Sequence, residues 1–130
     1  MHIHGIKRSV LSLLLHIGED SFPNEFLAQL LHTDGIIDNV FLIPGTITSP
    51  VSAYIRDDAR PIMTDIAGTA HSHPNGALLP SPTDVQNFAK IGGQCHLIIG
   101  PPFSSDSWRA FHANGKKRAL HIVEDDGEIG

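Results

Sequence analysis

Short apolar segments separated by glycine and proline turns set the strongest limit on how this chain can fold. Apolar residues at helical spacing predict an amphipathic helix over about residues 7–18, ended by Gly18. Shorter apolar runs have the length of strands, and we expect strands at residues 25–32, 36–43, 51–56, 65–72, 95–99, 108–112 and 119–123. Because helical and strand-like segments alternate, the sequence predicts an α/β domain with a central mixed sheet.

Turn and cap signals mark the ends of these segments. Asp34-Gly35 and Asn114-Gly115 each separate two apolar runs and predict hairpin turns. Ser81-Pro82-Thr83-Asp84 predicts a helix start, with the serine as N-cap, the proline at the first helical position and an acid in the first turn. Gly92-Gly93 is expected to end that helix.

Length, charge and cysteine content exclude several classes of protein. A chain of 130 residues has room for one domain, which we expect over residues 1–123. The net charge is −5, but four acids lie in the last seven residues, so residues 124–130 are expected to form a frayed acidic tail. Without a basic stripe, a nucleic-acid partner is not expected. The single cysteine, Cys95, excludes zinc sites built on paired cysteines, including the deaminase pattern.

The apolar run at residues 10–17 is similar to the core of a signal peptide. His16 interrupts it, Gly18 and two acids follow at once, and no cleavage site of small residues is present. The run is also too short to cross a bilayer. With one cysteine, a reducing cytoplasm fits best, and no membrane partner is expected.

Two histidines and an aspartate have the spacing of a metal site. His71 and His73 stand two apart at the end of a predicted strand, so both imidazoles point to one face. Asp84 follows eleven residues after His73, at the start of a helix, so the loop between them can bring its carboxylate back. Two histidines and a carboxylate with an open fourth position are typical of catalytic zinc. The other histidines are interpreted as surface or satisfied structural residues: His2, His4, His16, His32, His96, His112 and His121.

These residues resemble the signature of a known enzyme family. The run His71-Ser72-His73-Pro74, followed at fixed spacing by Ser81 and Asp84, is similar to the motif of the JAMM (MPN+) zinc metalloproteases. Upstream, Pro23-Asn24-Glu25 has the form in which that family carries its catalytic glutamate. The resemblance covers about residues 6–123 and is closest to minimal archaeal members. It implies a curved mixed sheet flanked by helices, as in the related cytidine deaminases.

The resemblance also implies a role for each residue. His71, His73 and Asp84 would hold one Zn²⁺ per chain, with a water in the fourth position. Glu25 would take the proton of that water and pass it to the leaving lysine amine. Ser81 would stabilise the oxyanion, a role that competes with helix capping for the same side chain. Ser72 is expected to face away from the metal and to be structural.

By resemblance, the expected activity is an isopeptidase that releases ubiquitin-like modifier proteins from their lysine conjugates. The Gly-Gly tail of the modifier is expected to add as a strand near residues 51–56, in contact with Tyr54 and Ile55. Three alternatives stay open: a peptidase that processes the C-terminus of a sulfur-carrier protein, a RadC-like protein suggested by Pro74-Asn75-Gly76, and a metal-free MPN scaffold. The oligomeric state has no signature in the sequence.

Overall fold

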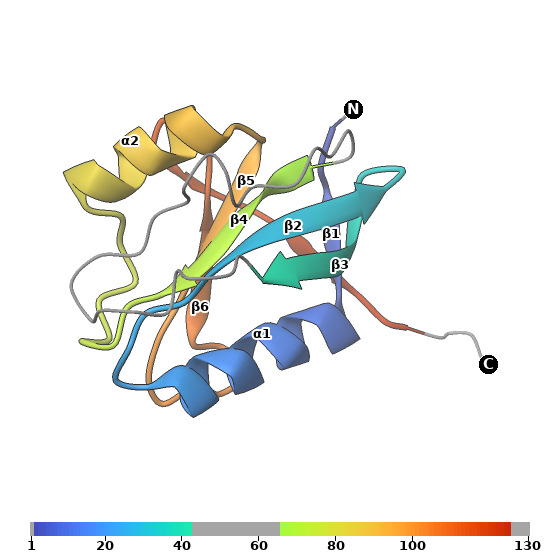
Figure 1. Ribbon diagram of the computed structural model, residues 1–130. Helices are drawn as coiled ribbons and strands as arrows, with labels where there is room; N and C mark the ends of the chain where they lie inside the picture. The colour runs from blue at the N-terminus through green and yellow to red at the C-terminus, as the bar shows by residue number, and fades with distance from the viewer. Residues whose placement is uncertain (1, 43–65, 126–130) are drawn as a thin grey trace.

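A mixed sheet of eight strands, with one helix on each face, forms the part of the chain that the computed structural model describes, residues 2–42 and 66–125 (Figure 1). The sheet order is β7-β6-β5-β4-β2-β3-β1-β8. The predicted α/β domain with a mixed sheet is confirmed. The elements are β1 (Gly5–Lys7), α1 (Arg8–Ser21), β2 (Leu27–Thr33), β3 (Ile36–Leu42), β4 (Ile66–Ser72), α2 (Pro82–Ile91), β5 (Cys95–Ile99), β6 (Trp108–Phe111), β7 (Lys117–Arg118) and β8 (His121–Val123).

The two faces of the sheet carry cores of different size. The larger core lies under α1, where Leu14 of the helix packs with Leu30 and Leu97 of the sheet. The smaller core lies under α2 and contains Phe88 and Ile98. Strand β5 is buried along its whole length because it lies between both helices. Burial of these apolar side chains is the main stabilising contribution to the fold.

The predicted turn and cap signals are found where expected. Asp34 and Gly35 both have positive φ, 53° and 85°, and form the two-residue turn between β2 and β3. Helix α2 begins after Ser81, with Pro82 in its first turn, and ends at Ile91, with Gly92 as its C-cap. The strand expected at residues 51–56, with Tyr54 and Ile55, lies outside the described residues.

The expectation that Gly18 ends the first helix is wrong. Helix α1 continues to Ser21, and Gly18 is buried inside it. A Cβ at this position would come within 2.8 Å of Phe103 Cε1 and 2.9 Å of Ile99 Cδ1. Glycine is therefore a close-packing residue here, since it lets the helix approach the sheet.

No helix among the described residues is long and apolar enough to cross a membrane.

The C-terminal region also differs from expectation. The turn at Asn114-Gly115 leads only to the short strand β7, which pairs with β6. The following strand β8 pairs in parallel with β1 at the opposite edge of the sheet. Only Ala119 and Leu120 separate β7 from β8, so the sheet curls until its two edges lie close together in space. The extended run at residues 119–123 is thus not the second strand of a hairpin.

The first two residues of the expected acidic tail are engaged rather than frayed. Glu124 pairs with Arg8 at 2.7 Å, and Asp125 Oδ1 accepts a hydrogen bond of 2.9 Å from the backbone N–H of Ser9. Since α1 has no side-chain cap of its own, Asp125 supplies the missing acceptor at its N-terminus. The residues from 126 onward lie outside the described part of the chain.

Candidate metal centre

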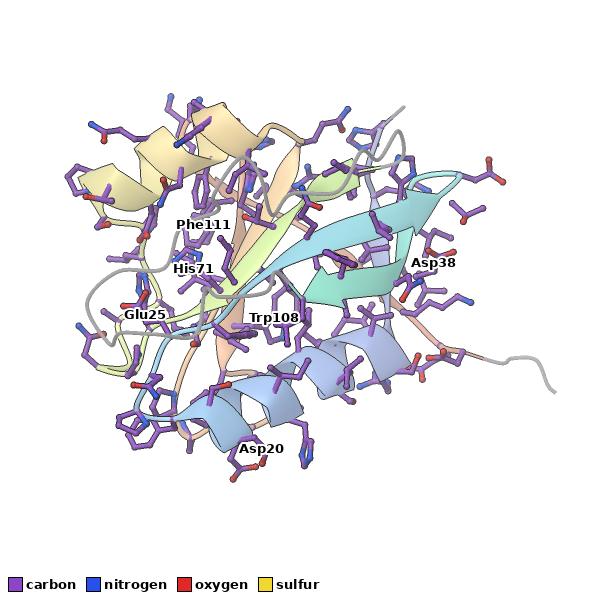
Figure 2. All side chains as sticks on the ribbon, viewed as in Figure 1. Asp20, Glu25, Asp38, His71, Trp108 and Phe111 are labelled. Atoms are coloured by element: carbon purple, nitrogen blue, oxygen red, sulfur yellow. The ribbon has the colours of Figure 1, made fainter. Side chains whose placement is uncertain are left out.

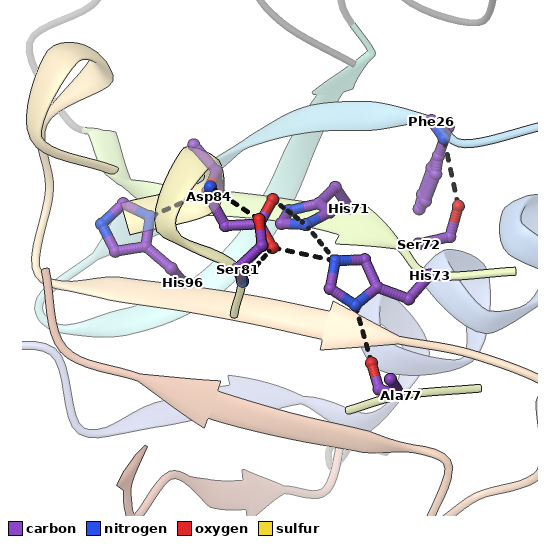
Figure 3. A network of polar contacts seen from close by, with 9 residues as sticks. Phe26, His71, Ser72, His73, Ala77, Ser81, Asp84 and His96 are labelled. Atoms are coloured by element: carbon purple, nitrogen blue, oxygen red, sulfur yellow. Dashed lines mark hydrogen bonds and ion pairs between the residues drawn. The ribbon is translucent and has the colours of Figure 1, made fainter. Parts of the chain in front are cut away.

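Strand β4 and helix α2 bring His71, His73 and Asp84 together (Figure 3). The two Nε2 atoms lie 3.1 Å apart. Asp84 Oδ1 lies 3.1 Å from His71 Nε2, and its Oδ2 lies 3.0 Å from His73 Nε2. The three predicted ligands therefore face one point between the end of the strand and the start of the helix.

A capping box aims the Asp84 carboxylate at the histidines. Ser81 Oγ accepts a hydrogen bond of 3.1 Å from the Asp84 N–H, and Asp84 Oδ2 accepts one of 2.8 Å from the Ser81 N–H. The same oxygen faces His73. The helix start that the sequence predicts is thus also the device that orients a ligand.

The hydrogen bonds of His73 leave its Nε2 available to a metal. Its Nδ1 lies 2.7 Å from the carbonyl oxygen of Ala77, which can only accept, so Nδ1 carries the proton in the neutral ring. Nε2 then presents a lone pair toward His71 and Asp84. A backbone carbonyl that orients a histidine in this way is typical of metal sites.

The donor separations fit zinc. Two nitrogens at the usual zinc distance in a tetrahedral site are roughly 3.3 Å apart, close to the separation of the two Nε2 atoms. Burial alone would raise the pKa of Asp84, but its close contacts with the rings of His71 and His73 hold that pKa well below its usual range. The carboxylate is therefore ionised, as a zinc ligand must be.

Glu25 lies next to this cluster because of the register between β2 and β4. Leu27 pairs with His71 in an antiparallel ladder, and the ladder continues where the Ser72 N–H donates to the Phe26 carbonyl. One step further, Glu25 comes opposite His73; Figure 2 shows Glu25 and His71 at the same end of the sheet. Burial raises the pKa of Glu25, the charge of Asp84 raises it further, and His73 opposes the shift. A carboxyl with a raised pKa is suited to acid–base work.

Comparisons with known proteins agree with this geometry. Residues 7–113 match the family of prokaryotic homologues of the JAB domain. The chain belongs to this family. A protein of Haloferax volcanii described as a probable metalloprotease is 36% identical over an alignment of 132 positions, gaps included, which covers 94% of this chain and 81% of that protein.

Two solved structures share the JAB-domain fold. A JAB1/MPN domain protein from Archaeoglobus fulgidus superposes with a TM-score of 0.77 and 28% identity, over 92% of this chain and 99% of that one. A second structure, described as JAMM, a metalloprotease-like zinc site in the proteasome and signalosome, gives a TM-score of 0.74 and 25% identity, over 94% and 99%. The JAMM/MPN resemblance and the metalloprotease-like class are confirmed, and a zinc site is supported by the three donors found together.

Both serines of the JAB-domain motif have clear structural positions. Ser72 Oγ accepts a hydrogen bond of 3.1 Å from the buried Phe26 N–H, which confirms its structural role. Ser81 is exposed, and its Oγ accepts the capping bond through a lone pair. In the part of the chain that the structure describes, its hydroxyl hydrogen has no acceptor and can donate, so capping does not compete with stabilisation of an oxyanion.

Among the histidines interpreted as surface or satisfied structural residues, His96 of the JAB domain differs from that description. It is fully buried, and its Nε2 has no hydrogen-bond partner among the residues that the structure describes. Burial lowers the pKa of His96 to about 4, so the ring is neutral near pH 7. The signal in the sequence is a histidine inside the otherwise apolar run Cys95–Ile99, but its neighbours come from other elements and are not visible there.

Proposed function

We propose that this JAB-domain protein is a zinc-dependent isopeptidase that hydrolyses the bond between the Gly-Gly C-terminus of a ubiquitin-like modifier and a substrate lysine. The observation that carries this proposal is the convergence of His71, His73 and Asp84, with Glu25 held beside them. This arrangement combines a tripod of ligands with a separate carboxyl, which a metal-dependent hydrolase needs.

Each side chain has a task at this site. Zinc, when bound, would polarise the scissile carbonyl and acidify a water. Glu25 would accept a proton from the attacking water and later deliver it to the leaving amine. Ser81 would donate its free hydroxyl hydrogen to the carbonyl oxygen as negative charge develops there.

Low exposure of the three donor side chains favours a thin substrate tail. The side chains of His73 and Asp84 are each 13% exposed, and that of His71 is 6% exposed. A tail of two glycines has no side chains to exclude, whereas larger residues would need more room. Contact of this tail with Tyr54 and Ile55 stays a prediction from the sequence.

The test uses one modifier in two forms, joined through its Gly-Gly tail to a lysine or extended by a peptide at its C-terminus. The zinc-loaded protein should release the lysine, and a chelator should stop this reaction. Cleavage of the extended form alone would favour the processing of a sulfur carrier instead. A protein that cannot be loaded with zinc at all would favour the scaffold alternative.

Replacement of one predicted ligand tests whether His73 belongs to the metal site. His73→Ala should lose bound zinc and activity together, because it removes one of three donors. His16→Ala is the matched control, since His16 is an exposed residue of α1. Equal zinc content in both variants would contradict the assigned site.

A further inference from the structure

His96 of β5 occupies a buried position directly behind the candidate metal centre. Thr69 of β4 is its partner across the parallel pair, and Thr69 Oγ1 lies 2.8 Å from His96 Nδ1. On its other side the imidazole stacks on Phe88 of α2, with ring centroids 4.2 Å apart and planes 11° from parallel. His96 therefore connects β4, at whose end the two histidine ligands lie, with the helix that carries Asp84.

Phe88 transmits this contact to the ligands. It is 1% exposed and stands four residues after Asp84, so the two side chains lie on the same face of α2 one turn apart. Its ring also lies against His71, with centroids 6.3 Å apart. A shift of Phe88 would move the first turn of α2 relative to His71 and His73.

We propose that His96, fixed by Thr69, is a positioning residue that holds α2 against β4 through Phe88 and so sets the separation of Asp84 from His71 and His73. This inference rests on the metal-binding part of the proposed function. The three donors would meet zinc only if strand and helix keep their present distance, because zinc–ligand distances vary little between sites.

The choice of side chain supports a role beyond filling space. An apolar residue at position 96 would fill the core without burying a nitrogen that has no hydrogen-bond partner in the described part of the chain, and such burial costs stability. A flat ring can stack closely on Phe88, and the bond to Thr69 sets the rotation of that ring. A branched aliphatic side chain offers neither feature.

The hydroxyl of Thr69 provides the sharpest test. Thr69→Val removes the hydrogen bond at nearly constant shape, and Thr69→Ser keeps it. We expect Thr69→Val to bind Zn²⁺ about 10-fold more weakly, at the lower end of the effect of removing a direct hydrogen-bond partner of a metal ligand, because Thr69 acts through His96 and Phe88. Thr69→Ser should bind as the unchanged protein does, and His96→Leu should follow Thr69→Val. The measurements are zinc affinity by competition with a chelator and the visible absorption spectrum of the Co²⁺-loaded protein.

Leu97→Val is the matched control for loss of stability. Leu97 is the next residue of β5, fully buried, and belongs to the core under α1. This variant should lower the Tm but leave zinc affinity and the Co²⁺ spectrum unchanged. If Thr69→Val behaves in the same way, His96 only fills the core and the proposal is wrong, even where His96→Leu fails to fold. Failure of the unchanged protein to bind zinc would instead overturn the proposed function, and this proposal with it.

Discussion

At the scale of single residues, hydrogen bonds around the candidate metal centre decide which atoms are free for chemistry. The carbonyl of Ala77 determines the tautomer of His73, and the backbone of Ser81 orients Asp84. Glu25 takes no part in these hydrogen bonds among the described residues, and it lies beside the cluster because it precedes β2, whose Leu27 pairs with His71. It can therefore be changed without removing a ligand.

Glu25→Gln tests the assignment of the base. The amide keeps the size of the side chain but cannot accept a proton, so kcat should fall about 10²–10⁴-fold. Zinc content and Tm should be unchanged, because Glu25 is not among the three donors. Glu19→Gln, an exposed substitution at the end of α1, is the control and should keep full activity. Full activity of Glu25→Gln would mean that another group is the base.

Substitutions of Ser81 separate capping from catalysis. Ser81→Ala should lose about 10²–10³-fold in kcat and about 1 kcal/mol of stability, since both the donor and the cap are removed. Ser81→Gly should lose the same rate but only a few tenths of a kcal/mol, because glycine is a fair N-cap. Ser81→Thr should keep both. Parallel losses of rate and stability across the series would argue that Ser81 only caps α2.

At the scale of elements, close approach of α1 to the sheet depends on Gly18. Helix propensity alone would make Gly18→Ala stabilising by about 1 kcal/mol. We expect a net loss of Tm instead, because the new methyl group would overlap the buried side chain of Ile99, and overpacking costs about 1–3 kcal/mol. Ser12→Ala, on the exposed face of the same helix, should show the gain from propensity alone. A higher Tm for Gly18→Ala would show that α1 can move away at no cost.

At the scale of the whole molecule, the candidate site joins a strand of the sheet, β4, to the start of the helix α2 that covers one face of the sheet. The metal would cross-link β4 to the first turn of α2, which otherwise packs on the smaller of the two cores. Any ligand that binds only the folded state stabilises it. Folding and metal binding should therefore be coupled.

Zinc should raise the Tm of the unchanged protein. Free zinc at about a hundred times its Kd contributes about 2.7 kcal/mol, which corresponds to a shift on the order of 10 °C for a chain of this size. A chelator should reverse the shift in a thermal unfolding experiment. His73→Ala should show no shift, and an equal shift in that variant would place the stabilising metal elsewhere.

Local signals in the sequence predicted the local structure well. The turn at Asp34-Gly35, the cap at Ser81 and the apolar strand Cys95–Ile99 depend on residues that are neighbours along the chain. The role of Gly18 has no local signal, because glycine both ends helices and permits close packing, and only its contact with Ile99 of the sheet distinguishes these two roles. The pairing of β8 has no local signal either, because its partner, β1, lies at the other end of the chain.

The same division applies to the candidate site. By itself, the sequence determined the fold class, the two histidines on one face of a strand and the capped helix that begins with Ser81 and Asp84, since each depends on backbone periodicity or on contacts within a few residues. Only the tertiary structure decided that Glu25 lies opposite His73, that Asp125 caps α1 and that His96 stacks behind His71 on Phe88. The first contact joins residues 48 positions apart and the second joins residues 116 positions apart, whereas the third depends on how α2 packs on the sheet. Register and packing are set by the whole core, so no local pattern can specify them.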